Sequence, residues 1–149
     1  MLIYLYTDGA SRSNPGLSAS GYRAFDASHR LLLKGAFFNG IKTNNEAEYL
    51  ALISGLEKVA EQFGFKNDVM AYSDSKLMSM QLSGKYKVKE DGLRKLFESC
   101  KRLSGKFGSF SITHVPRENT AIASVDKELN LLLDAIEKDR AGQQAASSN

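Results

Sequence analysis

Two aspartates follow strand-like runs, at positions where carboxylates can gather. Asp8 follows a run of β-forming residues at 2–7, and Asp74 follows a second run at 68–73. In open α/β sheets, ligands bind beyond the carboxyl ends of the strands. If these two strands are adjacent and parallel, Asp8 and Asp74 are expected to lie side by side at one end of the sheet.

Two further carboxylates are expected near the starts of helices. Glu48 lies in the first turn of a predicted helix that begins at Asn44 or Asn45, beside its apolar stripe. Asp126 lies in the first turn of the last predicted helix if Ser124 is its N-cap. Carboxylates packed this closely repel one another unless cations neutralise them. Hard oxygen ligands without His or Cys are typical of Mg²⁺ or Mn²⁺ sites.

Each of these acidic residues also has a purely structural interpretation. Asp8 precedes Gly9 and fits a turn, and Asp74 with Ser75 fits the N-cap of the helix that follows. The two carboxylates on helices would be favourable charges near helix N-termini. Taken singly, most of the four are explained in this way. Their joint placement at matching ends of one sheet is what favours a shared site.

The apolar spacing predicts an α/β domain with a mixed sheet and the element order β-β-β-α-β-α-α-β-α. Strands are predicted over residues 2–7, 21–26, 31–38, 68–73 and 109–115. Helices are predicted from 44 or 45 to about 63, over 75–82, from about 93 to 105, and from 124 to about 136. A loop over 11–17, which contains the turn signal Asn14-Pro15-Gly16, separates the first two strands.

Length and composition fit a single globular domain. The 149 residues are 42% hydrophobic and 25% charged, and a formal net charge of +3 permits a polyanionic partner without requiring one. A single cysteine, Cys100, excludes an internal disulfide and favours a reducing compartment, so we expect a cytoplasmic protein. No apolar run is long enough to cross a membrane. We expect a monomer with a catalytic domain over 1–140 and a flexible tail over 141–149.

Three motifs resemble those of the type 1 ribonucleases H. They are Asp8–Gly16 (DGASRSNPG), Thr43–Glu48 (TNNEAE) and Ser73–Ser75 (SDS), in the order and with roughly the spacing of that family. Residues 81–89 (QLSGKYKVK) and 114–118 (HVPRE) are similar to the compact bacterial and archaeal branch, which lacks a long basic protrusion. The resemblance covers about residues 1–138, and its motifs together are highly specific.

The resemblance implies a five-stranded mixed sheet with helices on both faces and a site of four carboxylates. It implies cleavage of the RNA strand of an RNA–DNA hybrid with two Mg²⁺ or Mn²⁺ ions, leaving 5′-phosphate and 3′-hydroxyl ends. Asp8, Glu48 and Asp74 correspond directly to catalytic and metal-binding positions of the family. Asp126 corresponds through a displaced motif, because the segment after Asn119 holds about two residues more than is usual.

Contacts to the hybrid are also implied by the resemblance. The positions that match contacts to the two strands are Gly9, Ser11, Arg12, Asn14, Asn44 and Asn45. Thr43 matches part of a pocket for a DNA phosphate, and Arg117 stands in the loop where some relatives carry a mobile catalytic histidine. His114 stands on a strand instead, so we interpret it as structural. Independently of the family, Lys85 and Lys87 belong to a basic run that also holds Lys89, Arg94 and Lys95. This run is interpreted either as a phosphate-backbone contact or as a solvated surface.

Other functions remain open from the sequence. A hybrid- or RNA-binding module that keeps the fold without catalysis is supported only by the irregular segment 119–126. Another metal nuclease of this fold, such as a junction resolvase or transposase core, fits the motif at 43–48 poorly. A phosphotransferase of the actin-like group also opens with Asp-Gly on a strand, but it needs a far longer chain.

Overall fold

The computed structural model describes the backbone of residues 1–147, which forms five strands and four helices. The strands are β1 (Leu2–Ser11), β2 (Gly16–Phe25), β3 (Leu31–Lys42), β4 (Asp68–Ser73) and β5 (Ser109–His114). The helices are α1 (Asn44–Phe63), α2 (Lys76–Leu82), α3 (Asp91–Ser104) and α4 (Thr120–Ser147). The predicted element order is confirmed.

The strands form one mixed sheet in the order β3-β2-β1-β4-β5. β1, β2 and β3 pair antiparallel as a meander, whereas β4 and β5 extend the sheet in parallel with β1. The central strand β1 therefore has an antiparallel neighbour on one side and a parallel neighbour on the other. This arrangement confirms the predicted mixed sheet and places the carboxyl ends of β1, β4 and β5 together.

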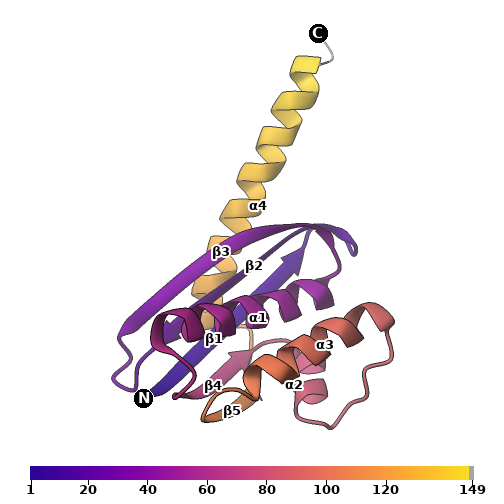
Figure 1. Cartoon of the computed structure of the whole chain (residues 1–149). Helices are drawn as coiled ribbons and strands as arrows, with labels where there is room; N and C mark the ends of the chain where they lie inside the picture. The colour runs from indigo at the N-terminus through magenta and orange to yellow at the C-terminus, as the bar shows by residue number, and fades with distance from the viewer. Residues whose placement is uncertain (148–149) are drawn as a thin grey trace.

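Helices cover both faces of the sheet, as predicted (Figure 1). On one face, α1, α2 and α3 bury the larger core, a hydrophobic cluster that includes Leu5 and Val69 of the sheet with Leu52 and Leu56 of α1. On the other face, α4 packs through Val125, Leu129 and Leu133 against Ala19 of β2. The two groups form separate hydrophobic clusters, so the sheet is a central layer between them.

The start of α1 is fixed by a capping box. The Thr43 side chain accepts from the Glu46 backbone N–H at 3.1 Å, and the Glu46 carboxylate accepts from the Thr43 N–H at 3.0 Å. These two bonds satisfy N–H groups that the first helical turn leaves unpaired. The helix therefore begins at Asn44, the first of the two predicted starts, and Glu48 lies in its first turns.

All three of the first strands differ from the prediction in at least one end, and β3 continues to Lys42 instead of ending at residue 38. β1 continues to Ser11 instead of ending at residue 7, and β2 begins at Gly16 instead of residue 21. The reason is the hairpin itself, because the Arg12 N–H donates to the Leu17 carbonyl at 2.8 Å and so prolongs the ladder through the predicted loop. Asp8 consequently lies within β1 and not after it.

The start and the end of α4 also differ from the prediction. The helix begins at Thr120, because the Asn119 side chain accepts from the N–H groups of Ala121 and Ile122 as a cap. The two additional residues of this segment therefore lie inside the helix and not in a loop before it. At the other end, residues 141–147 continue α4 where a flexible tail was predicted, and the helix extends beyond the sheet (Figure 1).

Good helix formers, Ala and Gln, account for most of that extension. Residues 148 and 149 of the predicted tail lie outside the described residues. Over the part of the chain that the structure describes, none of the helices is long and apolar enough to cross a membrane.

Candidate metal centre

Two aspartates meet where the parallel pairing between β1 and β4 ends. The last paired residues are Thr7 and Ser73, so Asp8 and Asp74 are the next residues on the two strands. Asp8 is still paired on its other side, with Gly21 of β2. The predicted juxtaposition of the two carboxylates is thus confirmed, although the end of the parallel ladder, and not the end of β1, produces it.

Glu48 approaches the same point because α1 lies unusually close to β1. A Cβ atom at Gly9 would lie 2.3 Å from the backbone carbon of Ala47, so only glycine permits this contact. The Ser20 hydroxyl on the neighbouring strand donates to the Ala47 carbonyl at 2.6 Å and secures the helix there. Glu48 is only 8% exposed as a result.

Asp8, Glu48 and Asp74 form a cluster of three carboxylates. Each offers one oxygen atom, and the three atoms lie within 4.8 Å of one another. The Gly9 N–H donates to Asp8 Oδ1 at 3.0 Å, and the Ser73 hydroxyl donates to Glu48 Oε2 at 3.4 Å. Sequence reasoning missed Ser73 as a partner of Glu48, although its position beside Asp74 on β4 is a signal that could have found it.

The electrostatics of the cluster are those of uncompensated negative charge. Burial raises the pKa of Asp8, and the charges of Glu48, Asp74 and Asp126 raise it further. Burial and the Asp74 charge likewise raise the pKa of Glu48, against hydrogen bonds that lower it. Among the described residues, no Lys or Arg forms an ion pair with these carboxylates. Oxygen donors with this excess of charge fit a hard divalent cation.

Asp126 faces the same cluster from α4. Together with the three carboxylates, it lines a cavity of about 250 Å³. Its approach depends on Gly21, which lies opposite Asp8 in the ladder, because a Cβ there would lie 2.9 Å from Cγ1 of Val125. α4 can therefore pack closely over β2 and bring Asp126, the residue after Val125, to Asp8.

The position of Asp126 within α4 differs from the prediction. The sequence predicted Asp126 in the first turn of a helix that Ser124 caps. The helix begins at Thr120 instead, yet Asp126 reaches the cavity from nearly two turns inside α4. Whether Asp126 reaches the cavity depends less on how far it lies from the start of α4 than on the point at which α4 crosses the sheet. Asp126 lies outside the group of three whose oxygens are within 4.8 Å.

Several of the residues expected to contact a hybrid connect the first hairpin to α1. The Asn44 side chain accepts from the Ser11 N–H at 2.8 Å, and the Asn14 side chain accepts from the Asn44 N–H at 3.0 Å. Gly9 and Asn44 also line the cavity of the carboxylates. These residues therefore form one rim of the site, whereas Thr43 serves as the cap of α1 and Asn45 lies in its first turn.

The two arginines expected at the site lie in different surroundings. Arg117 is exposed and is the one cationic residue among the described residues that line the carboxylate cavity. Arg12 turns instead toward α4, where it pairs with Asp134 at 2.8 Å and with Glu137 at 3.1 Å. A ring nitrogen of His114 lies 3.2 Å from the Asp74 carbonyl oxygen, which agrees with its structural interpretation.

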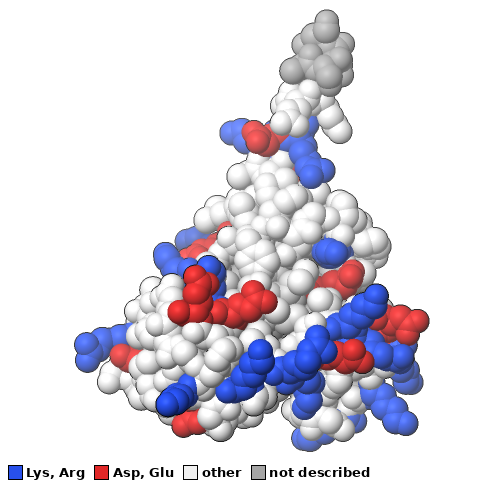
Figure 2. Space-filling model, in the orientation of Figure 1, with Lys and Arg blue, Asp and Glu red and all other residues white. Residues whose placement is uncertain are grey.

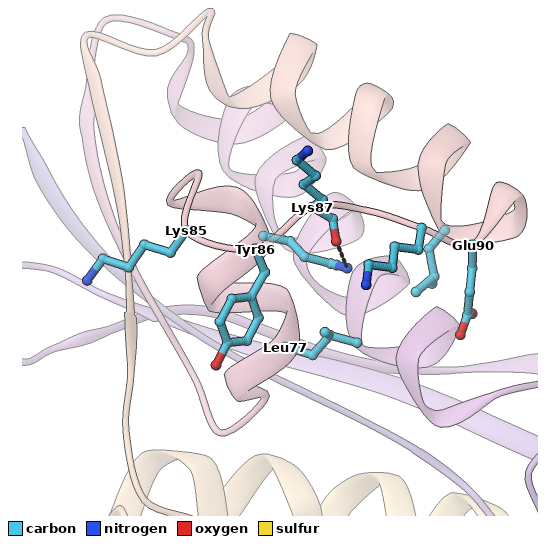
Figure 3. A pocket seen from close by; sticks show the side chains of 8 residues that line it. Leu77, Lys85, Tyr86, Lys87 and Glu90 are labelled. Atoms are coloured by element: carbon cyan, nitrogen blue, oxygen red, sulfur yellow. Dashed lines mark hydrogen bonds between the residues drawn. The ribbon is translucent and has the colours of Figure 1, made fainter.

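Three lysines of the basic run line a separate groove between α2 and α3 (Figure 3). The groove has a volume of about 560 Å³, and Lys85, Lys87 and Lys89 are among its lining residues. Figure 3 shows the Tyr86 ring beside Leu77, with the Lys85 side chain extending away from both. In Figure 2, Lys and Arg side chains gather over the side of the molecule occupied by α2 and α3 in Figure 1.

Sequence reasoning missed the aromatic part of that groove. Tyr86 is 44% exposed, and the Gln81 amide donates to the Lys87 carbonyl at 3.5 Å, which joins α2 to the basic run. The lone tyrosine between two lysines in the sequence was the signal available. The groove thus combines a flat apolar wall with cationic margins.

Comparisons with known proteins agree on one family. The chain matches the family model described as Reverse transcriptase-like over residues 6–125. It is 40% identical to the ribonuclease HI of Halobacterium salinarum over 77% of this chain and 57% of that protein. It is 35% identical to a bifunctional protein of Mycobacterium tuberculosis over 95% of this chain and 38% of that protein. The chain therefore spans less than two thirds of the length of either relative.

Solved structures match along nearly their whole length. The RNase H1 of the halophilic archaeon Halobacterium salinarum aligns with a TM-score of 0.84 and 36% identity, covering 91% of this chain and 99% of that one. The N-terminal RNase H domain of the mycobacterial protein aligns with a TM-score of 0.86 and 31% identity, covering 93% and 98%.

A third structure is an RNase H1 named LC11, in complex with an RNA/DNA hybrid, with a TM-score of 0.78 and 33% identity over 88% of this chain and 99% of that one. The family model covers most of this chain, and the structures that align with it share its sheet, its helices and about a third of its residues. On this sequence and structural evidence, the chain belongs to the ribonuclease H1 family.

Proposed function

We propose that this protein hydrolyses the RNA strand of RNA–DNA hybrids with the help of two divalent metal ions. The observation that carries the proposal is the cluster of Asp8, Glu48 and Asp74, whose oxygens lie within 4.8 Å of one another with no cationic partner among the described residues. Ribonuclease H relatives, one of them bound to an RNA/DNA hybrid, support the choice of reaction.

The carboxylates fit the role of metal ligands. Asp8, Glu48 and Asp74 would hold the ions, and Asp126 would act as the fourth ligand. When bound, a pair of Mg²⁺ or Mn²⁺ ions supplies Lewis acidity that favours deprotonation of a water and neutralises charge on the leaving oxygen. The Gly9 N–H and the Ser73 hydroxyl orient the carboxylates of Asp8 and Glu48 by hydrogen bonds.

Recognition of the RNA strand is proposed to use its 2′-hydroxyl groups. A water serves as the nucleophile in this reaction, so the 2′-hydroxyl remains free and the products carry 5′-phosphate and 3′-hydroxyl ends. A hybrid presents these hydroxyls in a wide, shallow minor groove. We propose that backbone and amide groups of the rim formed by Gly9, Ser11, Asn14 and Asn44 hydrogen-bond to these hydroxyls. Asn45 lies beside this rim in the first turn of α1.

Phosphate contacts are proposed at three places. Arg117 lines the carboxylate cavity and would contact a phosphate of the strand being cut. The Thr43 region at the start of α1 would contact a phosphate of the DNA strand. Lys85 and Lys87 would hold the backbone along the groove of Figure 3. Such contacts are electrostatic and release counterions from the nucleic acid, so binding weakens as the salt concentration rises.

We further propose a cytoplasmic protein that acts as a monomer. The single cysteine, Cys100, is a buried free thiol, which suits a reducing compartment. All four carboxylates that line the cavity come from one chain, so catalysis needs no second copy.

A substrate panel tests this function. A labelled RNA–DNA hybrid is compared with single-stranded RNA, duplex RNA and duplex DNA of the same sequence, each with Mg²⁺, with Mn²⁺ and with EDTA. We expect cleavage of the RNA strand of the hybrid alone, and only with a divalent ion. Tight hybrid binding without cleavage would instead indicate a binding module. Equal cleavage of duplex DNA would indicate another nuclease of this fold.

A further inference from the structure

The Asp126 carboxylate is held by a neighbour on its own helix. The Asn130 side-chain N–H₂ donates to Asp126 Oδ1 at 3.1 Å and to the Asp126 backbone carbonyl at 2.9 Å. An amide on the next turn therefore fixes both the carboxylate and the backbone from which it projects. This matters because Asp126 is half-buried, acts with its charge on Asp8 and lies well inside α4.

The orientation of the Asn130 amide is itself fixed by Arg12. One guanidinium nitrogen of Arg12 donates to the Asn130 side-chain oxygen at 3.3 Å and to its backbone carbonyl at 3.0 Å. The amide oxygen therefore faces a cation, and its N–H₂ group faces the two acceptors on Asp126. The reversed amide would present its oxygen to those acceptors and its donors to the guanidinium, which loses the three hydrogen bonds of the side chain and keeps only the one to the backbone carbonyl.

Arg12 is in turn held by two carboxylates further along α4. It pairs with Asp134 at 2.8 Å and with Glu137 at 3.1 Å. Its side chain thus joins the hairpin between β1 and β2 to three successive turns of α4. With all these contacts made, the guanidinium is directed toward α4 and not toward a ligand in the carboxylate cavity.

We propose that Asn130 is a positioning residue for Asp126 and that Arg12 acts through Asn130 by fixing its amide. The chain of contacts runs from the first hairpin through Arg12 and Asn130 to the fourth carboxylate. This inference rests on the proposed metal-dependent function for its consequence in catalysis. It also gives Arg12 a role different from the contact with the hybrid that the family resemblance implies.

The two roles of Arg12 predict different kinetic results. A direct phosphate contact contributes mainly to substrate affinity, so its loss would raise KM and reduce the salt dependence of binding. A positioning role contributes to metal binding and to the chemical step, so its loss lowers kcat and metal affinity with KM and salt dependence unchanged. The proposal requires the second result.

The test uses Asn130→Leu, which keeps the approximate volume and removes the donor, with Lys127→Ala as a control at an exposed neighbour on α4. Mn²⁺ binding to the protein without substrate is measured by titration calorimetry, followed by kcat and KM on a labelled hybrid. Losing an outer hydrogen bond to a metal ligand typically costs about 10-fold in affinity or activity. We expect a loss of about that size in Asn130→Leu and none in Lys127→Ala.

A double-mutant cycle with Asp126→Asn isolates the proposed path. If Asn130 acts through Asp126, Asn130→Leu causes no further loss of Mn²⁺ affinity in the Asp126→Asn background. An equal loss in both backgrounds, or wild-type affinity in Asn130→Leu, would overturn the proposal. Should Asn130→Leu melt too low to study, Arg12→Met tests the same path and must lower Mn²⁺ affinity with KM unchanged.

The outcomes also separate this inference from the proposed function. If the wild-type protein binds Mn²⁺ and the cycle shows coupling, but no hybrid is cleaved, the proposed reaction fails while the positioning role stands. If the hybrid is cleaved and the cycle shows no coupling, the positioning role fails while the reaction stands.

Discussion

At the scale of single residues, the site is governed by repulsion among buried carboxylates. Asp8 is 4% exposed and Glu48 is 8% exposed, and neither has a cationic side chain as a partner among the described residues. Desolvation and mutual repulsion both disfavour the ionised forms, so the pKa of each is raised. Without a cation, the folded protein keeps protons at this site that the unfolded chain releases.

A pH dependence of stability follows for the metal-free protein. Above the ordinary carboxyl pKa of about 4, the native state binds more protons at Asp8 and Glu48 than the unfolded state does. The free energy of unfolding therefore falls as the pH rises toward the raised pKa values, which is opposite to the usual effect of a paired carboxylate. Tm is to be measured in EDTA from about pH 4.5 to neutrality. Asp8→Asn removes one of the groups, so its Tm should fall less steeply, and a steeper fall than in wild type would contradict this account.

Asp126 should be less important than the three clustered carboxylates. It lies outside the group whose oxygens are within 4.8 Å, although its charge acts on Asp8. We expect Asp126→Asn to retain part of the activity in Mg²⁺ and to be partly rescued by Mn²⁺, which binds such ligands more tightly. Rates at saturating concentrations of each ion provide the measurement. Full activity in Mg²⁺ would remove Asp126 from the site.

At the scale of elements, close packing of helices on two glycines assembles the site. Gly9 lets α1 contact β1, and Gly21 lets α4 contact β2, so that Glu48 and Asp126 reach Asp8 from opposite faces of the sheet. Periodicity predicted the elements and a start of α1 at Asn44 or Asn45, but not the Thr43 cap that fixes this start. It could not predict the crossing point of α4, because that depends on contacts between residues about a hundred positions apart.

The close approach at Gly9 predicts a measurable loss of stability. A Cβ at this position would lie 2.3 Å from backbone atoms of Ala47, which cannot move as a flexible side chain does. We expect Gly9→Ala to destabilise the protein by roughly 1–3 kcal/mol and to reduce activity by displacing Glu48. Gly92→Ala on α3 is the matched control, because no atom lies within 4 Å of its added Cβ. Urea unfolding of both variants compares them, and equal stabilities would refute the packing argument.

At the scale of the whole molecule, the carboxylate cavity and the basic groove are separate features of one small domain. The cavity is negative and small, whereas the groove is cationic, larger and lined on one side by Tyr86. The close spacing of Lys85, Lys87 and Lys89 in the sequence predicted a basic surface but not a groove. The wall of the groove forms only where α2, the basic run and α3 meet in the fold. Binding and chemistry should accordingly respond to different substitutions.

The groove is tested by replacing its three lysines, Lys85, Lys87 and Lys89, with Ala. Because they would contact phosphates and no reacting atom, KM should rise more than kcat falls, and the salt dependence of hybrid binding should weaken. The control carries the same loss of charge at exposed lysines that do not line the groove, Lys66, Lys101 and Lys138. If both triple variants keep the wild-type salt dependence, the groove is only solvated surface.

Cleavage of an end-labelled RNA–DNA hybrid by the wild-type protein and by Asp74→Asn, side by side in Mg²⁺, tests the central claim most directly. Removing one charge from the cluster of Asp8, Glu48 and Asp74 weakens metal binding and relieves repulsion in the metal-free protein. We predict that the wild type cuts only the RNA strand, that Asp74→Asn does not cut, and that the Tm of the metal-free variant is unchanged or slightly raised. Cleavage by Asp74→Asn at close to the wild-type rate would contradict the account.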